Sequence, residues 1–495
     1  MTKWIMAIDQ GTSSTRWVLL DETAKSVCSS QKQFEQIYPH PGWVEHNPEE
    51  IWQSVLDTCR EVMAKADVQA QSIIGIGITN QRETTLIWNR QTGEVVYNAI
   101  VWQDRRTAKQ CNKIKESAFA DVIWKKTGLI VDPYFSASKI RWILDQDESF
   151  QQQAQNGELC FGTVDCYLLF KLSDGKSFKT DITNASRTML FNIKTKQWDD
   201  EILKYFNIPK IMLPQVCDNG FDFGETKLLG NTTDDTAIKI MAMAGDQHAA
   251  MIGQACFKKG QVKSTYGTGC FMMSQLGRDM CLSNNQLLTT IAFQFNGDTH
   301  YALEGSIFMA GATIAWLKDN LQIIEDVSQT EQHAINIGED NPVILIPAFV
   351  GLGAPFWKAD ATASIVGMTR DSHKSHIITA ALQACVYQSY DLLNAIQQDS
   401  KQIINDIKVD GAMVKNNWLM QFLTNITNTN VNVPENIETT AQGIAYAVML
   451  QTGLFNSLDD IEKNWKQSHQ FKNKMPEVLR SKLLTRWKNA LDKIL

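Results

Sequence analysis

Two apolar runs near the start of the chain flank a short polar turn. Residues 4–9 (WIMAID) and 17–20 (WVLL) are largely apolar, and GTSST lies between them. Short apolar runs separated by Gly, Ser and Thr are typical of β-hairpins. Residues 261–275 (QVKSTYGTGCFMMSQ) repeat the pattern, with a Gly-Thr turn between two β-rich runs. The sequence therefore predicts one hairpin in each half of the chain and, with them, a weak internal repeat.

Two further apolar runs end in polar residues. Residues 73–79 (IIGIGIT) lead into NQRE, and residues 239–245 (KIMAMAG) lead into DQH. Polar residues at strand ends often line clefts in α/β proteins. Residues 376–396 carry apolar side chains at helical spacing, which predicts an amphipathic helix. Because strands and helices alternate, we expect an α/β fold with two related domains and a cleft between them.

Composition excludes several classes of protein. The 495 residues include 47 Lys and Arg against 54 Asp and Glu, a net charge of −7, which disfavours nonspecific nucleic-acid binding. The first residues lack a signal-peptide core, and residues 343–350 are far shorter than the ~20 residues of a membrane span. Ten cysteines form no CxxC pair, so we expect reduced thiols and a cytoplasmic location.

The turn at residues 9–14 (DQGTSS) places an aspartate at a strand end, before hydroxyls and backbone amides. Such a turn suits phosphate, and the carboxylate suits Mg²⁺, although an ordinary turn has the same composition. A second turn at residues 265–269 (TYGTG) would let two hairpins hold a nucleotide from both sides of a cleft. The chain contains neither GxxxxGK[ST] nor GxGxxG, which disfavours P-loop and Rossmann folds.

Three polar residues at strand ends could carry chemistry. Arg82 offers a forked donor beside the Glu83 acceptor, which suits the adjacent hydroxyls of a polyol, but a surface ion pair would look the same. Asp246 could accept a hydroxyl proton as a general base, or it could cap the helix that begins near His248. Both roles of Asp246 are compatible.

Two other groups are interpreted as structural. His40, Glu45 and His46 do not match the spacing of HExxH, so zinc is disfavoured. Tryptophans in helical patterns, such as Trp52, Trp142 and Trp316, are expected to pack in the core.

The sequence resembles the glycerol kinases of the FGGY carbohydrate kinases over essentially its whole length. The matching runs are DQGTSSTR (9–16), YPHPGWVEHNP (38–48), GITNQRETT (77–85), NAIVWQDRRT (98–107), TGLIVDPYFSASKIRWILDQ (127–146), TNASRTMLFNI (183–193), AGDQHAA (244–250), TYGTGCFM (265–272), ALEGSIFMAGATIAWL (302–317), PAFVGLGAPFW (347–357) and VDGAMVKNNWLMQF (409–422). Several of these runs separate glycerol kinases from xylulose or gluconate kinases.

The resemblance implies an actin-like, ribonuclease-H-like fold of two ATPase domains that close over ATP and substrate. Residues 1–252 would bind glycerol and phosphate, and residues 253–495 would bind adenosine. The implied reaction is the Mg-ATP-dependent phosphorylation of glycerol to sn-glycerol 3-phosphate. Relatives are commonly dimers or tetramers, so we expect a homodimer or homotetramer with no membrane insertion.

The resemblance also assigns residues one by one. The glycerol-binding positions are matched by Arg82, Glu83, Tyr134, Asp246 and Gln247, and the apolar wall behind the carbon backbone by Trp102 and Phe271. The nucleotide side is matched by Thr12, Ser13, Ser14, Arg16, Thr268, Gly311 and Asn416, with Ala315 and Ala412 at further nucleotide positions. Asp246 would be the base, and Asp9 would position Mg²⁺ through water.

The sequence departs from the family pattern at two nucleotide positions. Ala315 stands where many members have a glutamine near the adenosine, and Ala412 stands where the adenosine loop has a second glycine. A lost hydrogen bond, or an alanine held at a glycine-type dihedral, costs on the order of 1 kcal/mol. We therefore expect a several-fold higher KM for ATP with little loss of turnover. Residues 226–237 contain neither an arginine for an anionic effector nor a histidine to phosphorylate, so we expect neither form of regulation.

Three alternatives differ in substrate or class. A kinase of the same fold could act on another small polyol or a ketopentose, but Trp102, Tyr134 and Phe271 predict a tight slot. A nucleotide-switched binding protein of the actin or heat-shock ATPase type would need no alcohol-binding residues. A catalytically silent homologue is disfavoured because every expected catalytic position is occupied.

Overall fold

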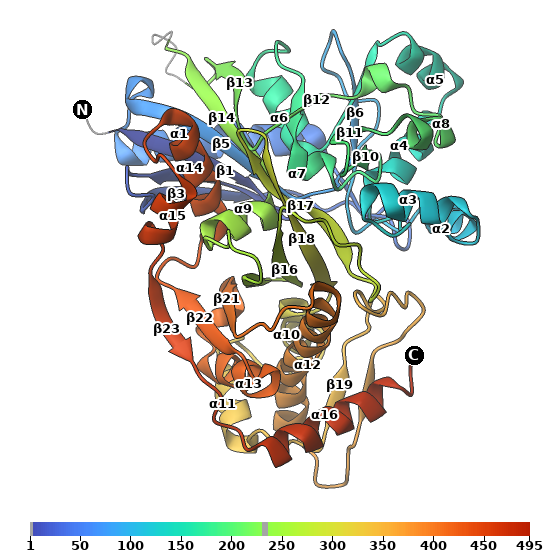
Figure 1. Ribbon diagram of the computed structural model, residues 1–495, viewed down its shortest axis with the longest axis vertical. Helices are drawn as coiled ribbons and strands as arrows, with labels where there is room; N and C mark the ends of the chain where they lie inside the picture. The colour runs from blue at the N-terminus through green and yellow to red at the C-terminus, as the bar shows by residue number, and fades with distance from the viewer. Residues whose placement is uncertain (1–2, 230–235) are drawn as a thin grey trace.

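Two mixed β-sheets form the framework of the protein (Figure 1). The computed structural model describes residues 3–229 and 236–495. The first sheet has the order β13-β14-β5-β1-β2-β3, with strands β1 (Trp4–Gln10), β2 (Ser14–Leu20), β3 (Ser26–Gln33), β5 (Ile73–Asn80), β13 (Gly220–Thr226) and β14 (Ile238–Gly245). The second has the order β17-β18-β16-β15-β21-β22-β23, with strands β15 (Val262–Tyr266), β16 (Cys270–Gly277), β17 (Leu288–Phe295), β18 (Asp298–Ile307), β21 (Asp406–Asp410), β22 (Asn430–Pro434) and β23 (Gln467–Phe471).

The two sheets share the same core topology. In the first, β1, β2 and β3 are antiparallel neighbours, while β5 and then β14 continue parallel to β1. In the second, β15, β16 and β18 are antiparallel neighbours, while β21 and then β22 continue parallel to β15. Both predicted hairpins are confirmed as β1–β2 and β15–β16. The internal repeat therefore extends well beyond the two Gly-Thr turns that suggested it.

Helices surround both sheets, and the short strands form separate two-stranded sheets. The helices are α1 (Pro48–Ala66), α2 (Ala108–Lys115), α3 (Phe119–Thr127), α4 (Ser136–Leu144), α5 (Glu148–Gln155), α6 (Val164–Leu172), α7 (Ile182–Ala185), α8 (Asp200–Tyr205), α9 (Asp246–Gly253), α10 (Gly311–Asp319), α11 (Gln329–Ile337), α12 (Lys374–Ser400), α13 (Asn417–Thr427), α14 (Thr439–Thr452), α15 (Leu458–Asn464) and α16 (Glu477–Leu491). The short strands are β4 (Glu45–His46), β6 (Leu86–Asn89), β7 (Ala99–Ile100), β8 (Leu159–Gly162), β9 (Lys179–Asp181), β10 (Phe191–Asn192), β11 (Gln197–Trp198), β12 (Gln215–Cys217), β19 (Ile344–Ile346) and β20 (Ser364–Val366). The helix predicted over residues 376–396 is confirmed as the longer α12.

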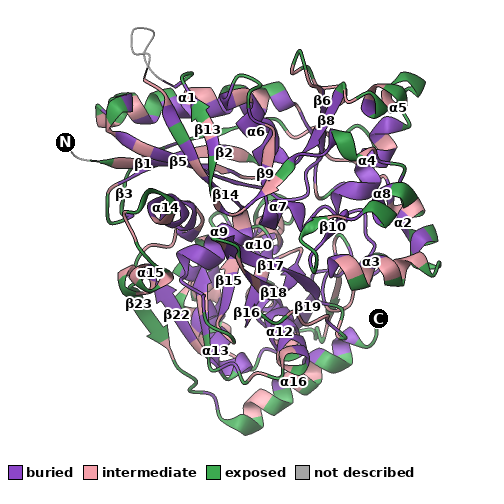
Figure 2. Cartoon of the chain, turned by 45° about the horizontal axis from the view of Figure 1, so that its top comes forward, coloured by how far each residue is buried: buried purple, intermediate pink, exposed green. Residues whose placement is uncertain are grey.

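Helix α14 comes from the second half of the chain but packs on the first sheet. Its buried residues share one core cluster with strands β1, β2 and β14 and with α9, and Figure 2 shows it as largely buried. The glycines of the IIGIGIT run make this approach possible. A Cβ at Gly75 would lie 2.8 Å from Val448 Cγ1, and a Cβ at Gly77 would lie 2.7 Å from Ile444 Cγ1. The Gly75–Gly77 pair is therefore a helix-packing site.

The β17–β18 hairpin of the second sheet also meets elements of the first half. The amide of Thr289 donates to the carbonyl oxygen of Gly128 at 2.9 Å, and the Tyr301 hydroxyl donates to the carbonyl oxygen of Ile193 at 3.0 Å. These contacts bring Glu304, on the same hairpin, beneath the strand ends of the first sheet. The two halves are thus joined by buried elements and not only by surface loops.

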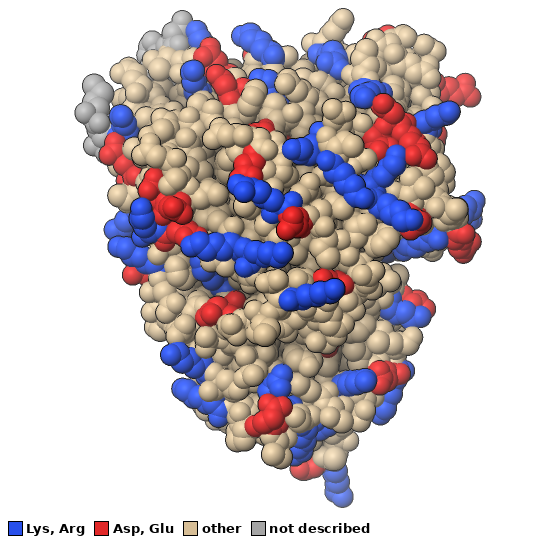
Figure 3. Space-filling model, in the orientation of Figure 1, with Lys and Arg blue, Asp and Glu red and all other residues tan. Residues whose placement is uncertain are grey.

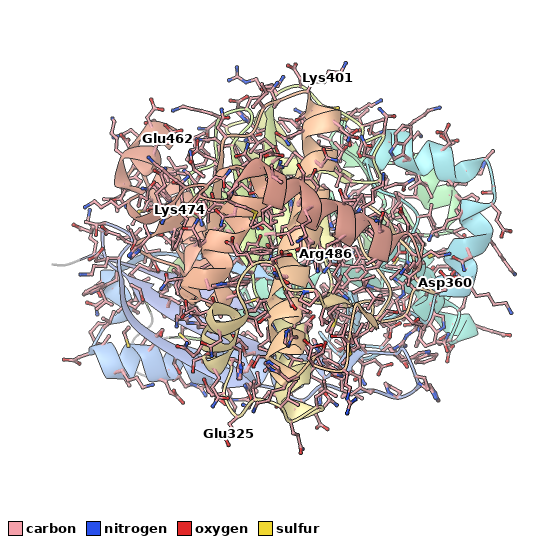
Figure 4. All side chains as sticks on the ribbon, turned by 90° about the horizontal axis from the view of Figure 1, so that it is seen from below. Glu325, Asp360, Lys401, Glu462, Lys474 and Arg486 are labelled. Carbon is pink, nitrogen blue, oxygen red and sulfur yellow. The ribbon has the colours of Figure 1, made fainter. Side chains whose placement is uncertain are left out.

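The C-terminal helix closes the base of the second half. Figure 4, seen from below, shows α16 lying across this end with Arg486 labelled on it. Arg486 pairs with Asp340 at 2.8 Å, and the indole N–H of Trp487 donates to Asp391 Oδ2 at 2.8 Å on α12. The long helix α12 is thereby fixed beneath the second sheet.

The structure gives the environment of the cysteines, of Glu45 and of the surface charges. All ten cysteines are free, and most are buried. Glu45 accepts hydrogen bonds from Tyr97, Asn98 and Arg106, and among the described residues no cluster of His, Cys, Asp or Glu could hold a metal ion. Within the described ranges, no helix has both the length and the apolar character to cross a bilayer. Positive and negative side chains are interspersed on the face in Figure 3. Of the loop 226–237, residues 230–235 lie outside the described residues.

Candidate active site

A small polar cavity lies where the strand ends of both sheets meet. It has a volume of about 190 Å³. It is lined by Thr12, Ser13, Arg82, Glu83, Trp102, Tyr134, Asp246, Gln247, Thr265, Gly267, Thr268, Gly269 and Phe271. All seven residues that the sequence matched to a polyol site are in this set. The cavity therefore draws residues from both halves of the chain around one small space.

Strand geometry explains how the polar residues reach this cavity. Strands β5 and β14 are parallel neighbours and end together, because Asn80 pairs with Gly245. Arg82 follows β5, and Asp246 is the first residue of α9, directly after β14. Glu83 adopts a left-handed backbone with φ of +61°. Non-glycine residues in this conformation carry a local energetic cost that the surrounding structure must offset.

A buried network of ion pairs holds Arg82 and Glu83, and they do not pair with each other. Arg82 donates to both oxygens of Glu304, NH1 to Oε2 at 2.6 Å and NH2 to Oε1 at 2.9 Å. Arg187 donates from Nε to Glu83 Oε1 at 2.6 Å and from NH2 to Glu304 Oε1 at 3.1 Å. All four side chains are almost fully buried. The two guanidinium groups hold the pKa of Glu304 well below its ordinary value, against the opposing effect of burial.

Asp246 presents its carboxylate to the cavity beside Arg82. Asp246 Oδ1 lies 3.3 Å from Arg82 Nε and accepts the backbone N–H of Gln247 at 2.6 Å. The side chain is 28% exposed, in contrast to the buried Glu304. Burial raises the pKa of Asp246, while Arg82 acts in the opposite direction. A carboxylate with a raised pKa at a cavity wall is suited to accept a proton from an alcohol.

Three aromatic rings form one wall of the cavity. The Trp102 ring meets Tyr134 edge-on, with centroids 5.6 Å apart, and meets Phe271 with centroids 6.1 Å apart. The indole N–H of Trp102 donates to Thr12 Oγ1 at 2.9 Å. Because this bond fixes the ring to the first Gly-Thr turn, the wall is pre-organised and the space between it and Asp246 is limited.

A second cavity of about 870 Å³ adjoins the first, and the two share Gly267 and Thr268. It is lined mostly by apolar groups from α10, α11, α13 and the loops between them. Five residues that the sequence matched to the nucleotide lie on it: Thr268, Gly311, Ala315, Ala412 and Asn416. Trp316, which we expected in the core, also lines this cavity and packs against Phe349 with centroids 4.6 Å apart. Its pattern on α10 did not distinguish a core face from a cavity wall.

The expectation of backbone strain at Ala412 is wrong. The left-handed conformation belongs to Gly411, with φ of +92°, and a Cβ there would lie 2.4 Å from the carbonyl oxygen of Tyr266. Ala412 instead begins a 3₁₀ turn over Ala412–Lys415, and it is not among the residues with positive φ. The family's second glycine is therefore not required by dihedral strain in this chain.

Three predicted nucleotide or metal residues lie outside both cavity linings. Asp9 is the last residue but one of β1, and burial together with the charge of Asp246 raises its pKa to about 7, with Arg16 opposing the shift. Ser14 Oγ accepts a hydrogen bond from Gln31 Nε2 at 2.8 Å. Arg16 forms an ion pair with Glu438. These residues lie in or beside the first Gly-Thr turn.

Sequence reasoning gave no role to several residues of this site. Glu304 and Arg187 complete the buried network, and Lys263 contacts Gln247 beside the first cavity. Glu304 and Arg187 lie within the matched runs ALEGSIF and TNASRT. Those runs were the available signal, since nothing in local spacing pairs residues so far apart in the chain.

Comparison with known proteins identifies the family. The model of the FGGY family of carbohydrate kinases, N-terminal domain, matches residues 4–253, and that of the C-terminal domain matches residues 262–452. A glycerol kinase from Alteromonas mediterranea is 50% identical over 100% of this chain and 99% of its own length. Glycerol kinase 1 from Pseudomonas aeruginosa is 48% identical, with the same coverage of each chain.

Solved structures agree with the sequence relatives. The glycerol kinase of Plasmodium falciparum with ADP has a TM-score of 0.91 and 36% identity, covering 100% of this chain and 98% of that one. A xylulose kinase from Lactobacillus acidophilus has a TM-score of 0.87 at 23% identity, which supports the fold alone. The expected two-domain, actin-like α/β fold is confirmed. By its sequence, its sheets and its relatives, this chain belongs to the FGGY family of carbohydrate kinases.

Proposed function

We propose that this protein transfers the γ-phosphoryl group of Mg-ATP to glycerol, producing sn-glycerol 3-phosphate and ADP. The observation that carries the proposal is the meeting of the two cavities at Gly267 and Thr268. One is small and polar, with Asp246 on its wall, and the other is large and apolar enough for an adenosine. Full-length relatives named glycerol kinases support the choice of acceptor. Residues 1–252 would supply most of the glycerol and phosphate contacts, and residues 253–495 the adenosine contacts.

Asp246 is the proposed general base. Its carboxylate accepts the proton of the terminal hydroxyl as that oxygen bonds to the γ-phosphorus, and the bond from the γ-phosphorus to the oxygen of ADP breaks. Arg82 Nε, 3.3 Å from Asp246, keeps the carboxylate oriented. Phosphoryl transfer has a loose transition state, so positioning and charge neutralisation contribute more than the base itself.

The residues around Asp9 fit a magnesium ion. Asp9 and Asp246 are close enough for each charge to influence the other, and the described residues provide no hydrogen bond to the Asp9 carboxylate. Because no cluster of three ligand side chains exists among the described residues, Mg²⁺ would take its other ligands from water and phosphate, as it commonly does. When bound, the ion would neutralise phosphate charge. Asp9 is the residue that would hold it.

The aromatic wall supports a three-carbon acceptor. Trp102 is held by its hydrogen bond to Thr12, so moving this wall of the 190 Å³ cavity outward would break that bond. A ketopentose or a longer polyol is the alternative substrate, and it would need a displaced Trp102. Comparing turnover of glycerol with turnover of xylulose distinguishes the two.

A coupled ADP-release assay with Mg-ATP and glycerol tests the proposal. Asp246→Asn should abolish glycerol-dependent turnover, and Asp174→Asn is the matched control because Asp174 is exposed and its left-handed backbone suits asparagine. Turnover with a longer polyol but not with glycerol would show that the acceptor is the longer polyol. No acceptor-dependent turnover would contradict the kinase activity.

The proposal also includes a cytoplasmic location and a homodimer or homotetramer. Free, mostly buried thiols are consistent with a reducing compartment. Light scattering coupled to size-exclusion chromatography measures the oligomeric state, and a monomer across the working concentration range would contradict this part.

A further inference from the structure

A fully buried lysine contacts two residues that line the small cavity. Lys263 is on β15, and its side chain has no solvent exposure. Its ammonium group donates to Gln247 Oε1 at 2.5 Å and to Thr265 Oγ1 at 3.1 Å. Both partners line the cavity. Burying a lysine is costly unless its charge is paired and hydrogen-bonded, so this position needs a physical reason.

The contact with Lys263 determines how the Gln247 carboxamide is oriented. An ammonium group only donates hydrogen bonds, so the atom of Gln247 that it meets must be the oxygen. The Nε2 group then points away from Lys263. Gln247 Nε2 hydrogen-bonds to the Asp246 carboxylate at the cavity wall, and Gln247 itself lines the cavity. A carboxamide nitrogen carries two N–H groups, so a second donor remains beside Asp246. The carboxamide is therefore set as a donor toward the cavity.

The same lysine is connected to the nucleotide side. Thr265 is paired with Asp410 across neighbouring strands, and its hydroxyl hydrogen-bonds to the Asp410 carboxylate. Asp410 also accepts from Gln254 Nε2 and from Thr439 Oγ1, both at 2.8 Å. Asp410 directly precedes Gly411 and Ala412, and Ala412 lines the large cavity. A continuous chain of hydrogen bonds thus runs from Gln247 to the loop of the second cavity.

Burial lowers the pKa of Lys263, and the nearby Arg82 acts in the same direction. Asp410, Glu304 and Asp246 oppose this shift and stabilise the ammonium form. A neutral amine could present a lone pair to Gln247, and the amide orientation would then no longer be fixed. The neighbouring carboxylates are therefore part of the arrangement.

We propose that Lys263 is a positioning residue that fixes Gln247 Nε2 as a donor to a hydroxyl oxygen of the acceptor alcohol. This inference rests on the proposed function, because it assigns a partner to the same alcohol site. Lys263 touches neither substrate. It acts through Gln247, and its removal leaves the amide free to turn its oxygen toward the cavity.

A double-mutant cycle tests the proposal on the full-length protein. The variants are Lys263→Met, Gln247→Ala and the combination of both, and the readouts are the KM for glycerol, the KM for ATP and kcat. Loss of a hydrogen bond set by a charged group predicts about a tenfold rise in the KM for glycerol in each single variant. The double variant should be little worse than either single variant, because both remove the same interaction. The KM for ATP should change much less.

Lys408→Met is the matched control. Lys408 is the register partner of Lys263 on β21, but its ammonium group donates to the carbonyl oxygen of Gln254 at 2.6 Å, outside both cavities. Its KM for glycerol should stay close to that of the parent protein. If Lys263→Met does not fold, Lys263→Leu, which likewise lacks a donor, takes its place in the cycle.

Two outcomes would overturn the proposal. One is an unchanged KM for glycerol in the Lys263 variants, and the other is a double variant whose KM rises by the product of the two single effects. Absence of glycerol turnover in the parent protein would instead contradict the proposed function, so the two failures are distinguishable.

Discussion

Arg16 and Glu438 form an ion pair between strand β2 of the first sheet and the residue that precedes α14. The Arg16 side chain is 24% exposed and that of Glu438 is 45% exposed. We propose that Arg16 binds phosphate in the first Gly-Thr turn. Glu438 and the phosphate oxygens would then compete for one guanidinium group.

Replacing Glu438 by glutamine should strengthen nucleotide binding. The change removes a negative charge near the proposed phosphate site and frees Arg16, so we expect the KM for ATP to fall several-fold. Because the pair is partly exposed, stability should change by no more than about 1 kcal/mol. Steady-state kinetics at fixed glycerol measures the effect, with the exposed Glu435→Gln as control. A higher KM for ATP would mean that Glu438 supports the nucleotide site instead.

Replacing Glu304 by glutamine should damage both stability and activity. Arg82 and Arg187 share this carboxylate, and the neutral amide removes the negative charge that both buried guanidinium groups contact. Breaking a buried ion pair on one side costs about 3–5 kcal/mol. We expect a clear drop in Tm and a large loss of kcat/KM for glycerol. Glu225→Gln, on the exposed face of β13, is the control. Equal Tm values for the two variants would refute the stabilising role of the network.

The buried carboxyl of Asp391 should make stability depend on pH. Burial raises its pKa to about 7, with the Trp487 hydrogen bond opposing the shift. Between about pH 4 and pH 7 the folded chain retains a proton that the unfolded chain has lost. This contribution to the free energy of unfolding is therefore present below about pH 4 and decreases up to about pH 7, by at most ~1.4 kcal/mol per pH unit.

Thermal melts of the parent protein and of Asp391→Asn across this range measure the contribution. Asparagine cannot titrate, and its side-chain oxygen still accepts from Trp487, so the variant should lose less Tm than the parent protein between about pH 5 and pH 7. If Tm falls equally with pH in the parent protein and in Asp391→Asn, another group causes the pH dependence of stability. The exposed Asp174→Asn should follow the parent protein.

Restoring the family residue should lower the KM for ATP at position 315 but not at position 412. Ala315 lines the large cavity, so Ala315→Gln adds a hydrogen-bonding group and should lower the KM for ATP several-fold. Ala412 is not strained, so Ala412→Gly should bring no gain. Parallel ATP titrations of the two variants test both statements. A lower KM for ATP in Ala412→Gly alone would indicate that the backbone of Ala412 is strained.

Local sequence patterns were sufficient to predict the functional residues that directly follow a strand. Arg82 and Asp246 follow apolar runs directly, and parallel strands that end together bring such residues to one edge. The two Gly-Thr turns were likewise visible because short apolar runs flank them. These features depend on a few neighbouring residues, which a sequence displays.

Contacts between distant segments were not accessible in this way. Arg82 and Glu304 are separated by 222 positions, and a glutamate inside a strand gives no sign of the arginine it will meet. Lys263 presents the same difficulty, because its burial depends on α9 packing against β15. In the loop that contains Gly411 and Ala412, the left-handed conformation belongs to Gly411, so a residue-by-residue match to the family assigned the strain to the wrong position.

The packing of α14 against the first sheet also sets an order of events on the ribosome. Strand β5 emerges early in synthesis, but the helix that covers Gly75 and Gly77 is made near the end of the chain. Until residues 439–452 have emerged, the nascent protein carries an uncovered apolar sheet face, which is the kind of surface that binds chaperones or aggregates. The first half of this protein can therefore become a closed unit only after translation is nearly complete.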